Sequence, residues 1–105
     1  MIGDNTQNNL FSFFSGLVIR KLRRERGISG MELAKQLNIS QQQMSRYERG
    51  VNKFSIDMLF NILIILGVPF EYFLKLLIIE IKYNESSDFL VFKERISTLD
   101  LNYFY

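Results

Sequence analysis

The sequence predicts an all-α fold, because three kinds of local signal agree. Apolar residues recur at intervals of three and four over most of the chain, the spacing that places them on one helix face. Two patterns of the form Ser-x-x-Glu or Ser-x-x-Gln mark helix starts. A glycine, the residue that most readily adopts a left-handed C-cap, follows three predicted helices, at Gly27, Gly50 and Gly67. With 105 residues, the chain has the size of one domain.

The first two helices are predicted upstream of a tight turn. Residues 1–9 are polar and rich in Asn, and we expect them to form a disordered N-terminus. Apolar residues at helical spacing then begin a helix at Leu10, which becomes basic and ends near Arg26. Ser29 and Glu32 form a capping box that starts the second helix.

The third helix follows this turn directly. Asn38 occupies the turn, and Asn tolerates a positive φ better than most residues with a side chain. Ser40 and Gln43 form a second capping box, and Gly50 ends the helix. Residues 29–50 are therefore predicted to form a helix, a turn and a second helix.

The remaining helices are less uniform in pattern. Ser55 can cap a fourth helix over residues 56–66, and Pro69 stands at the start of a fifth. Residues 70–81 carry two apolar stripes, which predicts a helix that is buried on both sides. Alternation of apolar and charged residues at 79–83 also fits a strand, with a hairpin turn at 84–87 into residues 89–92. We favour the helix, followed by a last helix near residues 88–96.

Composition excludes several classes of function. The chain has no Cys and no His, so it has no disulfide, no thiolate nucleophile and none of the commonest metal ligands. Neither a catalytic constellation nor a nucleotide-binding glycine loop is present, so we expect no enzyme, no cofactor, no metal and no small-molecule ligand. The most apolar run, residues 58–70, is shorter than the ~20 residues that span a bilayer. No secretory signal is evident, and the expected location is cytoplasmic.

Positive charge is concentrated in one part of the chain. Residues 17–53 carry nine Lys and Arg against three Glu, although the net charge of the whole chain is only +2. A basic block in a nearly neutral chain indicates a localised surface for a polyanion, or else an ordinary solvated face.

The third predicted helix supplies the candidate site. Met44, Tyr47 and Val51 share one face with Ile39, and this face should pack on the second helix. The opposite face carries polar and basic side chains suited to base edges, since Gln pairs with adenine and Arg with guanine. The candidates for base contact are Gln41, Gln42, Ser45 and Arg46. The alternative is an ordinary polar helix face.

A second group of residues is predicted to lie near the DNA backbone or to hold the helices together. Ser40 caps the third helix, whose N-terminus favours an anion such as phosphate. Further candidates for phosphate contact are Gln43, Arg49, Asn52 and Lys53. Arg23 and Glu48 fall on the inner sides of the first and third helices, and we predict a partly buried, structural ion pair between them.

Over residues 17–74 the chain resembles the Cro/C1-type (XRE) helix-turn-helix family, whose domains are lambda repressor-like. The motifs that match are IRKLR, GIS, ELA, the NIS turn, RYERG and, later, LGVPFEYFL. The resemblance implies a five-helix DNA-binding bundle whose third helix reads the major groove. It implies base contact for Gln41, Gln42 and Arg46, a mixed role for Ser45, backbone proximity for Ser40 and Gln43, and an internal ion pair for Arg23 and Glu48.

Two positions depart from the family pattern. Gly30 stands where the family often has a Gln that clamps a phosphate, so that side-chain contact is missing. Phe54 stands where a Pro is common before the fourth helix, which leaves the path of this loop open.

From the extent of the resemblance we assign residues 10–75 to the DNA-binding domain. Residues 76–105 form an apolar extension, predicted to be helical, that is a candidate dimerisation element.

The functional hypothesis is a sequence-specific, double-stranded DNA-binding transcription regulator associated with the bacterial nucleoid. The segment SQQQMSRYERG further resembles the MrpJ-type regulators of fimbrial operons, which implies repression of motility and flagellar genes. A homodimer is expected, because one recognition helix reads only a few base pairs; residues 70–81 and 89–92 are the candidate interface. Two alternatives stay open: an antitoxin-type protein that neutralises a toxin partner, and an adaptor that has lost DNA binding.

Overall fold

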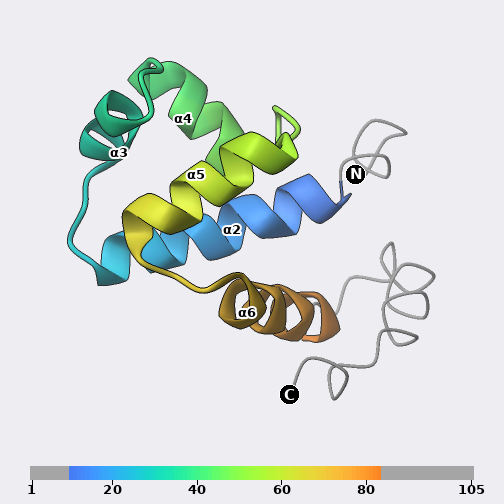
Figure 1. Ribbon diagram of the computed structural model, residues 1–105. Helices are drawn as coiled ribbons and strands as arrows, with labels where there is room; N and C mark the ends of the chain where they lie inside the picture. The colour runs from blue at the N-terminus through green and yellow to red at the C-terminus, as the bar shows by residue number, and fades with distance from the viewer. Residues whose placement is uncertain (1–9, 84–105) are drawn as a thin grey trace.

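A computed structural model describes residues 10–83, and these form five α-helices joined by short loops (Figure 1). The prediction of an all-α fold with five helices is confirmed. The predicted last helix, the predicted hairpin and the two chain ends lie outside the described residues. The helices are α2 (Leu10–Glu25), α3 (Gly30–Gln36), α4 (Gln41–Glu48), α5 (Ile56–Leu66) and α6 (Phe70–Lys82).

The helix starts follow the capping signals with one difference. At α4 the capping box is complete: Ser40 Oγ accepts from Gln43 N at 3.0 Å, and Gln43 Oε1 accepts from Ser40 N at 3.3 Å. At α3 only half of the predicted box forms, because Ser29 Oγ accepts from Glu32 N but no bond returns from the Glu32 carboxylate. Ser55 caps α5 in the same one-sided way.

The predicted left-handed turns are confirmed. Gly27, Gly50 and Gly67 all have positive φ, and Asn38, with φ +58°, is the non-glycine residue with positive φ in the described part of the chain. At Asn38 the backbone turns between α3 and α4, and the following Ile39 N–H donates to Ala34 O at 3.0 Å. This turn sets the angle at which α4 leaves α3.

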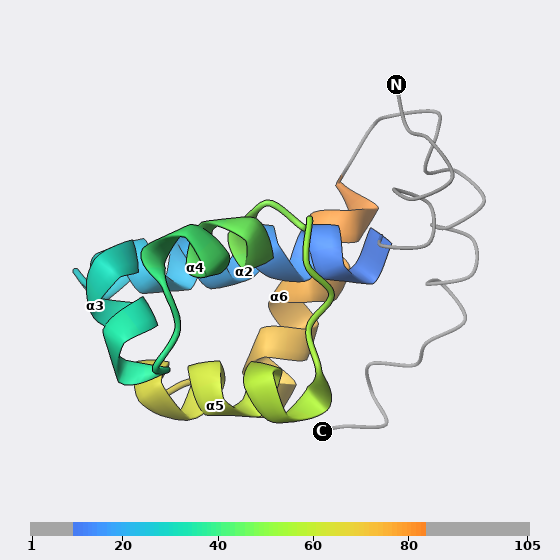
Figure 2. The ribbon, with the colours of Figure 1, turned by 90° about the horizontal axis from the view of Figure 1, so that it is seen from above.

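The core lies between the five helices, all of which contribute buried apolar residues. α2 packs against α4 and against α6, while α3 contacts α4 and α5 (Figures 1 and 2). Large apolar side chains with essentially no exposure fill the space between these helices: Phe14, Ile19, Leu22, Leu33, Met44, Ile62, Phe73 and Ile81. Their close packing fixes α4 against the rest of the domain, so that only its outer face is available to a partner.

The prediction of helix for residues 70–81 is confirmed, since α6 continues to Lys82 and leaves no strand at 79–82. The prediction that both apolar stripes are buried is wrong within the described residues. Phe73, Leu77, Ile78 and Ile81 are buried, whereas Tyr72, Ile79 and Tyr83 on the other stripe are 48%, 39% and 80% exposed. The reason is that α6 packs on α2 and α5 mainly through the first stripe, and of the second stripe only Leu76 is packed against the core of the described residues.

Val51 is also misplaced by the sequence prediction. α4 ends at Glu48, so the helical wheel cannot be extended to residue 51. Gly50 has a φ of +77° and redirects the chain, and Val51 N–H donates to Arg46 O at 2.9 Å. The Val51 side chain is consequently 56% exposed and does not pack on α3.

The approach of α2 to the end of α4 is unusually close at Gly16. A Cβ atom built on Gly16 would lie 2.5 Å from the carbonyl oxygens of both Tyr47 and Glu48. Real Cβ atoms do not come this near to backbone oxygens, so only glycine fits here. Gly50 makes a similar approach to α2, with Phe13 Cα 2.6 Å from its ideal Cβ position.

Candidate nucleic-acid interface

The polar candidates gather on the outer face of α4. Its inner residues, Met44 and Glu48, are 1% and 7% exposed, and they fix the rotation of the helix about its axis. The residues predicted for base contact point the other way, and all four are exposed: Gln41, Gln42, Ser45 and Arg46. Their side chains make no hydrogen bond or ion pair with any part of the chain that the structure describes. Their amide, hydroxyl and guanidinium groups are therefore available to an external ligand.

The residues predicted for backbone contact are spread over both ends of α4. Ser40 and Gln43 lie at the N-terminus, where the capping box already uses the Ser40 hydroxyl and the Gln43 carbonyl oxygen. The amide NH2 of exposed Gln43 is left free to donate. Arg49 forms the C-cap, while Asn52 and Lys53 lie in the loop that leads to α5. Arg49 and Lys53 are exposed and Asn52 is half-buried.

Phe54 anchors this loop. Its ring stacks on Tyr47, with 5.0 Å between ring centroids and 24° between the ring planes. The stacking ties the loop to the last turn of α4. The path that the sequence left open is thus held by an aromatic contact.

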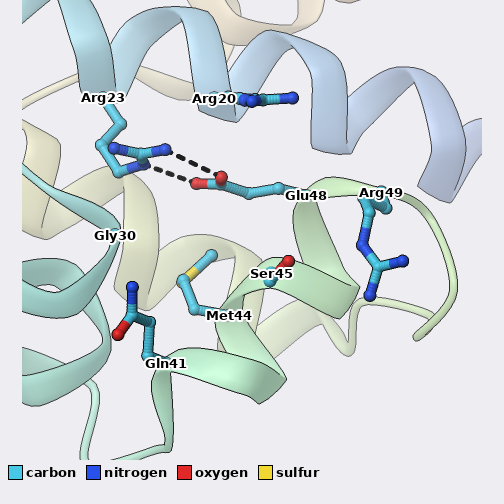
Figure 3. A pocket seen from close by; sticks show the side chains of 8 residues that line it. All are labelled: Arg20, Arg23, Gly30, Gln41, Met44, Ser45, Glu48 and Arg49. Atoms are coloured by element: carbon cyan, nitrogen blue, oxygen red, sulfur yellow. Dashed lines mark hydrogen bonds and ion pairs between the residues drawn. The ribbon is translucent and has the colours of Figure 1, made fainter.

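Arg23 and Glu48 form a bidentate ion pair between α2 and α4 (Figure 3). Arg23 Nε donates to Glu48 Oε2 at 2.7 Å, and Nη2 donates to Oε1 at 3.0 Å. The third nitrogen, Nη1, donates to Ile28 O at 2.9 Å. The side chains are 11% and 7% exposed. The pKa of the Arg23 guanidinium is raised above its usual value, because the hydrogen bonds to Glu48 outweigh the lowering by burial and the charge of Glu48 adds to them.

A hollow opens beside this pair. It has a volume of about 240 Å³, and α2, α3 and α4 all contribute to its lining (Figure 3). Arg20 of α2 and Gly30 of α3 lie on it together with residues of α4. Sequence reasoning counted Arg20 only within the basic block. The signal that separates it from the other basic residues is three-dimensional: of the arginines on α2, only Arg20 and Arg23 line the hollow.

Residues 10–83 carry little that would suit another kind of site. No group of three or more His, Cys, Asp or Glu side chains that could hold a metal ion occurs among them. Within the same residues no single helix is long and apolar enough to cross a membrane; α5 and α6 together reach the length and composition, but they are bent by 105°.

A helix-turn-helix family model matches residues 19–73, slightly more than half of the chain. The chain belongs to this helix-turn-helix family. The match covers the helix-turn-helix pair α3–α4 and its supporting helices, and it agrees with the Cro/C1-type resemblance of the sequence. The family is non-enzymatic, in agreement with the prediction for this domain.

The helix-turn-helix chain is also similar to curated bacterial proteins. An uncharacterised HTH-type transcriptional regulator of Sinorhizobium medicae (strain WSM419) is 36% identical over 73 residues, which are 70% of this chain and 52% of the relative. A protein described in the same way from Rhizobium meliloti (strain 1021) matches to the same extent. An uncharacterised transcriptional regulator in the ATPase CF(0) region of Rhodospirillum rubrum is 36% identical over 58 residues, 55% of this chain and 54% of the relative.

The chain spans about half the length of these curated relatives. The comparison with solved structures gives no significant match.

Proposed function

We propose that this helix-turn-helix domain binds double-stranded DNA in a sequence-specific manner and regulates transcription. α4 lies in the major groove, with Gln41, Gln42, Ser45 and Arg46 facing the base edges. The backbone contacts come from Ser40, Gln43, Arg49, Asn52 and Lys53. The observation that carries the proposal is the exposed outer face of α4, whose amide and guanidinium groups have no partner among residues 10–83.

The chemistry of this face suits direct readout. Gln42 can donate one hydrogen bond to adenine and accept one from it, and Arg46 can donate two to guanine. Each such pair is worth about 1–3 kcal/mol of discrimination against the wrong base. The basic residues around α4 add a salt-dependent attraction to phosphates that does not depend on sequence.

Selection of bound sequences from a random duplex library, followed by fluorescence anisotropy, tests the proposal. Wild-type protein should enrich one motif, and Gln42→Ala and Arg46→Ala should each relax the preference at different base pairs. Gln36→Ala is the matched control, because Gln36 is an exposed glutamine near the end of α3. Salt-independent binding, or enrichment of no motif, would contradict a sequence-specific regulator and would favour an adaptor.

We further propose that the protein acts as a homodimer, because a second copy doubles the number of base pairs that are read. Support comes from the apolar side chains that remain exposed. Ile56, Phe60 and Ile64 form a stripe on α5 at intervals of four residues, with exposures of 71%, 39% and 73%, and the Phe60 ring stacks on Phe70. Ile79 of α6, which is 39% exposed, belongs to a second apolar stripe together with exposed Tyr72 and Tyr83.

Sedimentation velocity distinguishes the two stripes. Ile64→Glu and Ile79→Glu each place a charge on an exposed position, so the monomer fold should survive. The variant that sediments as a monomer identifies the interface. If the wild-type protein sediments as a monomer at all concentrations, the proposal of a homodimer is wrong.

The regulated genes are proposed from sequence alone. The segment SQQQMSRYERG resembles MrpJ-type regulators, which supports repression of motility and flagellar genes in coordination with fimbrial expression, on the bacterial nucleoid. Genome-wide mapping of bound sites in the source bacterium tests this directly. Bound sites upstream of flagellar genes would support it, and their absence would leave a regulator of other genes.

A further inference from the structure

The second apolar stripe of α6 faces away from the core. It consists of residues at intervals of four, three and four, which places them on one side of the helix: Tyr72, Leu76, Ile79 and the C-cap Tyr83. The buried stripe lies on the opposite side, and α6 lies at one edge of the bundle (Figure 1). No segment within residues 10–83 covers Tyr72, Ile79 or Tyr83, so this apolar side of α6 is open to a partner.

The chain itself carries a matching stripe shortly after α6. Apolar residues recur there at intervals of three, four and three, the spacing of one helix face: Phe89, Phe92, Ile96 and Leu99. Glu94 falls on the opposite side of such a helix, as expected for an amphipathic segment. These residues lie outside the described part of the chain, and the helix is an expectation from their sequence.

The two stripes agree in length. With a rise of about 1.5 Å per residue, the stripe from Tyr72 to Tyr83 is roughly 16 Å long and that from Phe89 to Leu99 is roughly 15 Å. In an antiparallel arrangement Phe89 lies beside Tyr83 at one end, and Leu99 lies beside Tyr72 at the other. Each apolar residue of one stripe can therefore contact the other stripe along its whole length.

The link between the stripes suits a reversal of the chain. Residues 84–88 are all polar, and a connection of this length is typical of two antiparallel helices. Asn84 follows the C-cap of α6, a position where Asn is found next after Gly, and Ser87 and Asp88 are residue types that begin helices. So short a link gives the tethered stripe an effective concentration on the order of millimolar, which favours it over a second molecule in dilute solution.

We propose that residues 89–99 form a helix that packs antiparallel on the second stripe of α6 in the same chain. The inference goes beyond the proposed function, and it does not require DNA binding. It also narrows the choice of dimer interface. With the α6 stripe covered, the exposed stripe of α5 remains for a second copy: Ile56, Phe60 and Ile64.

Pairs of introduced cysteines test the contact in the full-length protein. The chain has no Cys, so a disulfide can form only between the introduced residues. Ile79→Cys combined with Phe92→Cys places both thiols on the facing stripes. Ile79→Cys combined with Glu94→Cys is the matched control, because residue 94 falls on the far side of the expected helix. On oxidation of dilute protein with glutathione disulfide, the first pair should close within one chain and the control pair should not, as seen by non-reducing electrophoresis.

Limited proteolysis provides an independent measurement. Trypsin cleaves after Lys93 and Arg95, which a packed helix protects. Ile79→Glu puts a carboxylate into the contact, so cleavage at these two sites should become about tenfold faster or more, because burying a charge opposes docking and cleavage follows the population of the open form. Ile64→Glu, the same substitution on the exposed stripe of α5, should leave the rate unchanged. Circular dichroism checks that both variants are folded, and the cysteine pairs test the contact without an added charge.

Two outcomes would overturn the inference. A disulfide between two chains, in place of one within a chain, would mean that a second copy covers the α6 stripe. Failure of the first pair to close, together with equal trypsin cleavage of wild-type protein and Ile79→Glu, would mean that residues 89–99 do not pack there. Neither outcome affects the proposal of DNA binding, which is tested separately by the selection of bound sequences.

Discussion

Replacing Gly16 by alanine tests the close approach of α2 to α4. Two effects of opposite sign act at this position. Alanine favours a helix interior over glycine by about 1 kcal/mol, so helix propensity alone predicts a more stable protein. The new methyl group, however, would stand 2.5 Å from two carbonyl oxygens of α4, those of Tyr47 and Glu48.

The clash should win. Ordinary contact requires ~3.5 Å, so the end of α4 must move by roughly 1 Å. The colliding atoms belong to the backbone, so no change of side-chain rotamer can relieve them. Overpacking of this kind costs about 3 kcal/mol or more when the backbone has to shift, which leaves a net loss of about 2 kcal/mol after the gain in propensity. For a domain of this size that corresponds to a fall in Tm of roughly 8–16 °C.

Urea denaturation followed by circular dichroism measures the effect. The control is Gly30→Ala, the same substitution at another helical glycine, where the nearest atom is 3.8 Å away and the change should stay within about 0.5 kcal/mol. A Gly16→Ala protein as stable as the wild type would refute the close approach of α2 to α4.

Three further stability predictions concern the ion pair, the cap and the turn. Glu48→Gln should lower the free energy of unfolding by about 3 kcal/mol, because it leaves the Arg23 charge without its buried partner. The control is Glu25→Gln, at an exposed position of α2, and thermal unfolding compares the two variants. Equal Tm values would contradict burial of the pair. Ser40→Ala removes the side-chain cap of α4 and should cost about 1 kcal/mol in urea unfolding, whereas an unchanged midpoint would mean that the cap contributes nothing. At the turn, where φ is +58°, Asn38→Ala should cost about 1 kcal/mol and Asn38→Gly should cost nothing; the opposite order in Tm would exclude a left-handed residue.

Most of the helix boundaries could be predicted because they depend on local chemistry. A serine that bonds to a backbone N–H three residues ahead, or a glycine that adopts a left-handed conformation, is recognisable without knowledge of distant contacts. For the same reason the outer face of α4 could be predicted, since periodicity within one helix separates its polar side from its apolar side.

The errors arise where distant parts of the chain decide the outcome. Val51 fits the inward face by periodicity, but Gly50 ends the helix before that face can continue. The second stripe of α6 is apolar, yet within the described residues Tyr72, Ile79 and Tyr83 of this stripe remain exposed. The contact of Gly16 with the backbone of α4, and the position of Arg20 on the hollow, depend on how α2 packs against α4. No local sequence pattern encodes this packing.

The contact between Gly16 and the carbonyl oxygens of α4 has a consequence for evolution and for protein engineering. The packing of α4 against the domain depends on main-chain atoms and on a few inward side chains, none of which belongs to the outer face. Residues on the outer face can therefore be exchanged without disturbing this packing. Under the proposed function, the domain should therefore acquire new sequence preferences through changes at Gln41, Gln42 and Arg46, while the packing of α4 stays the same.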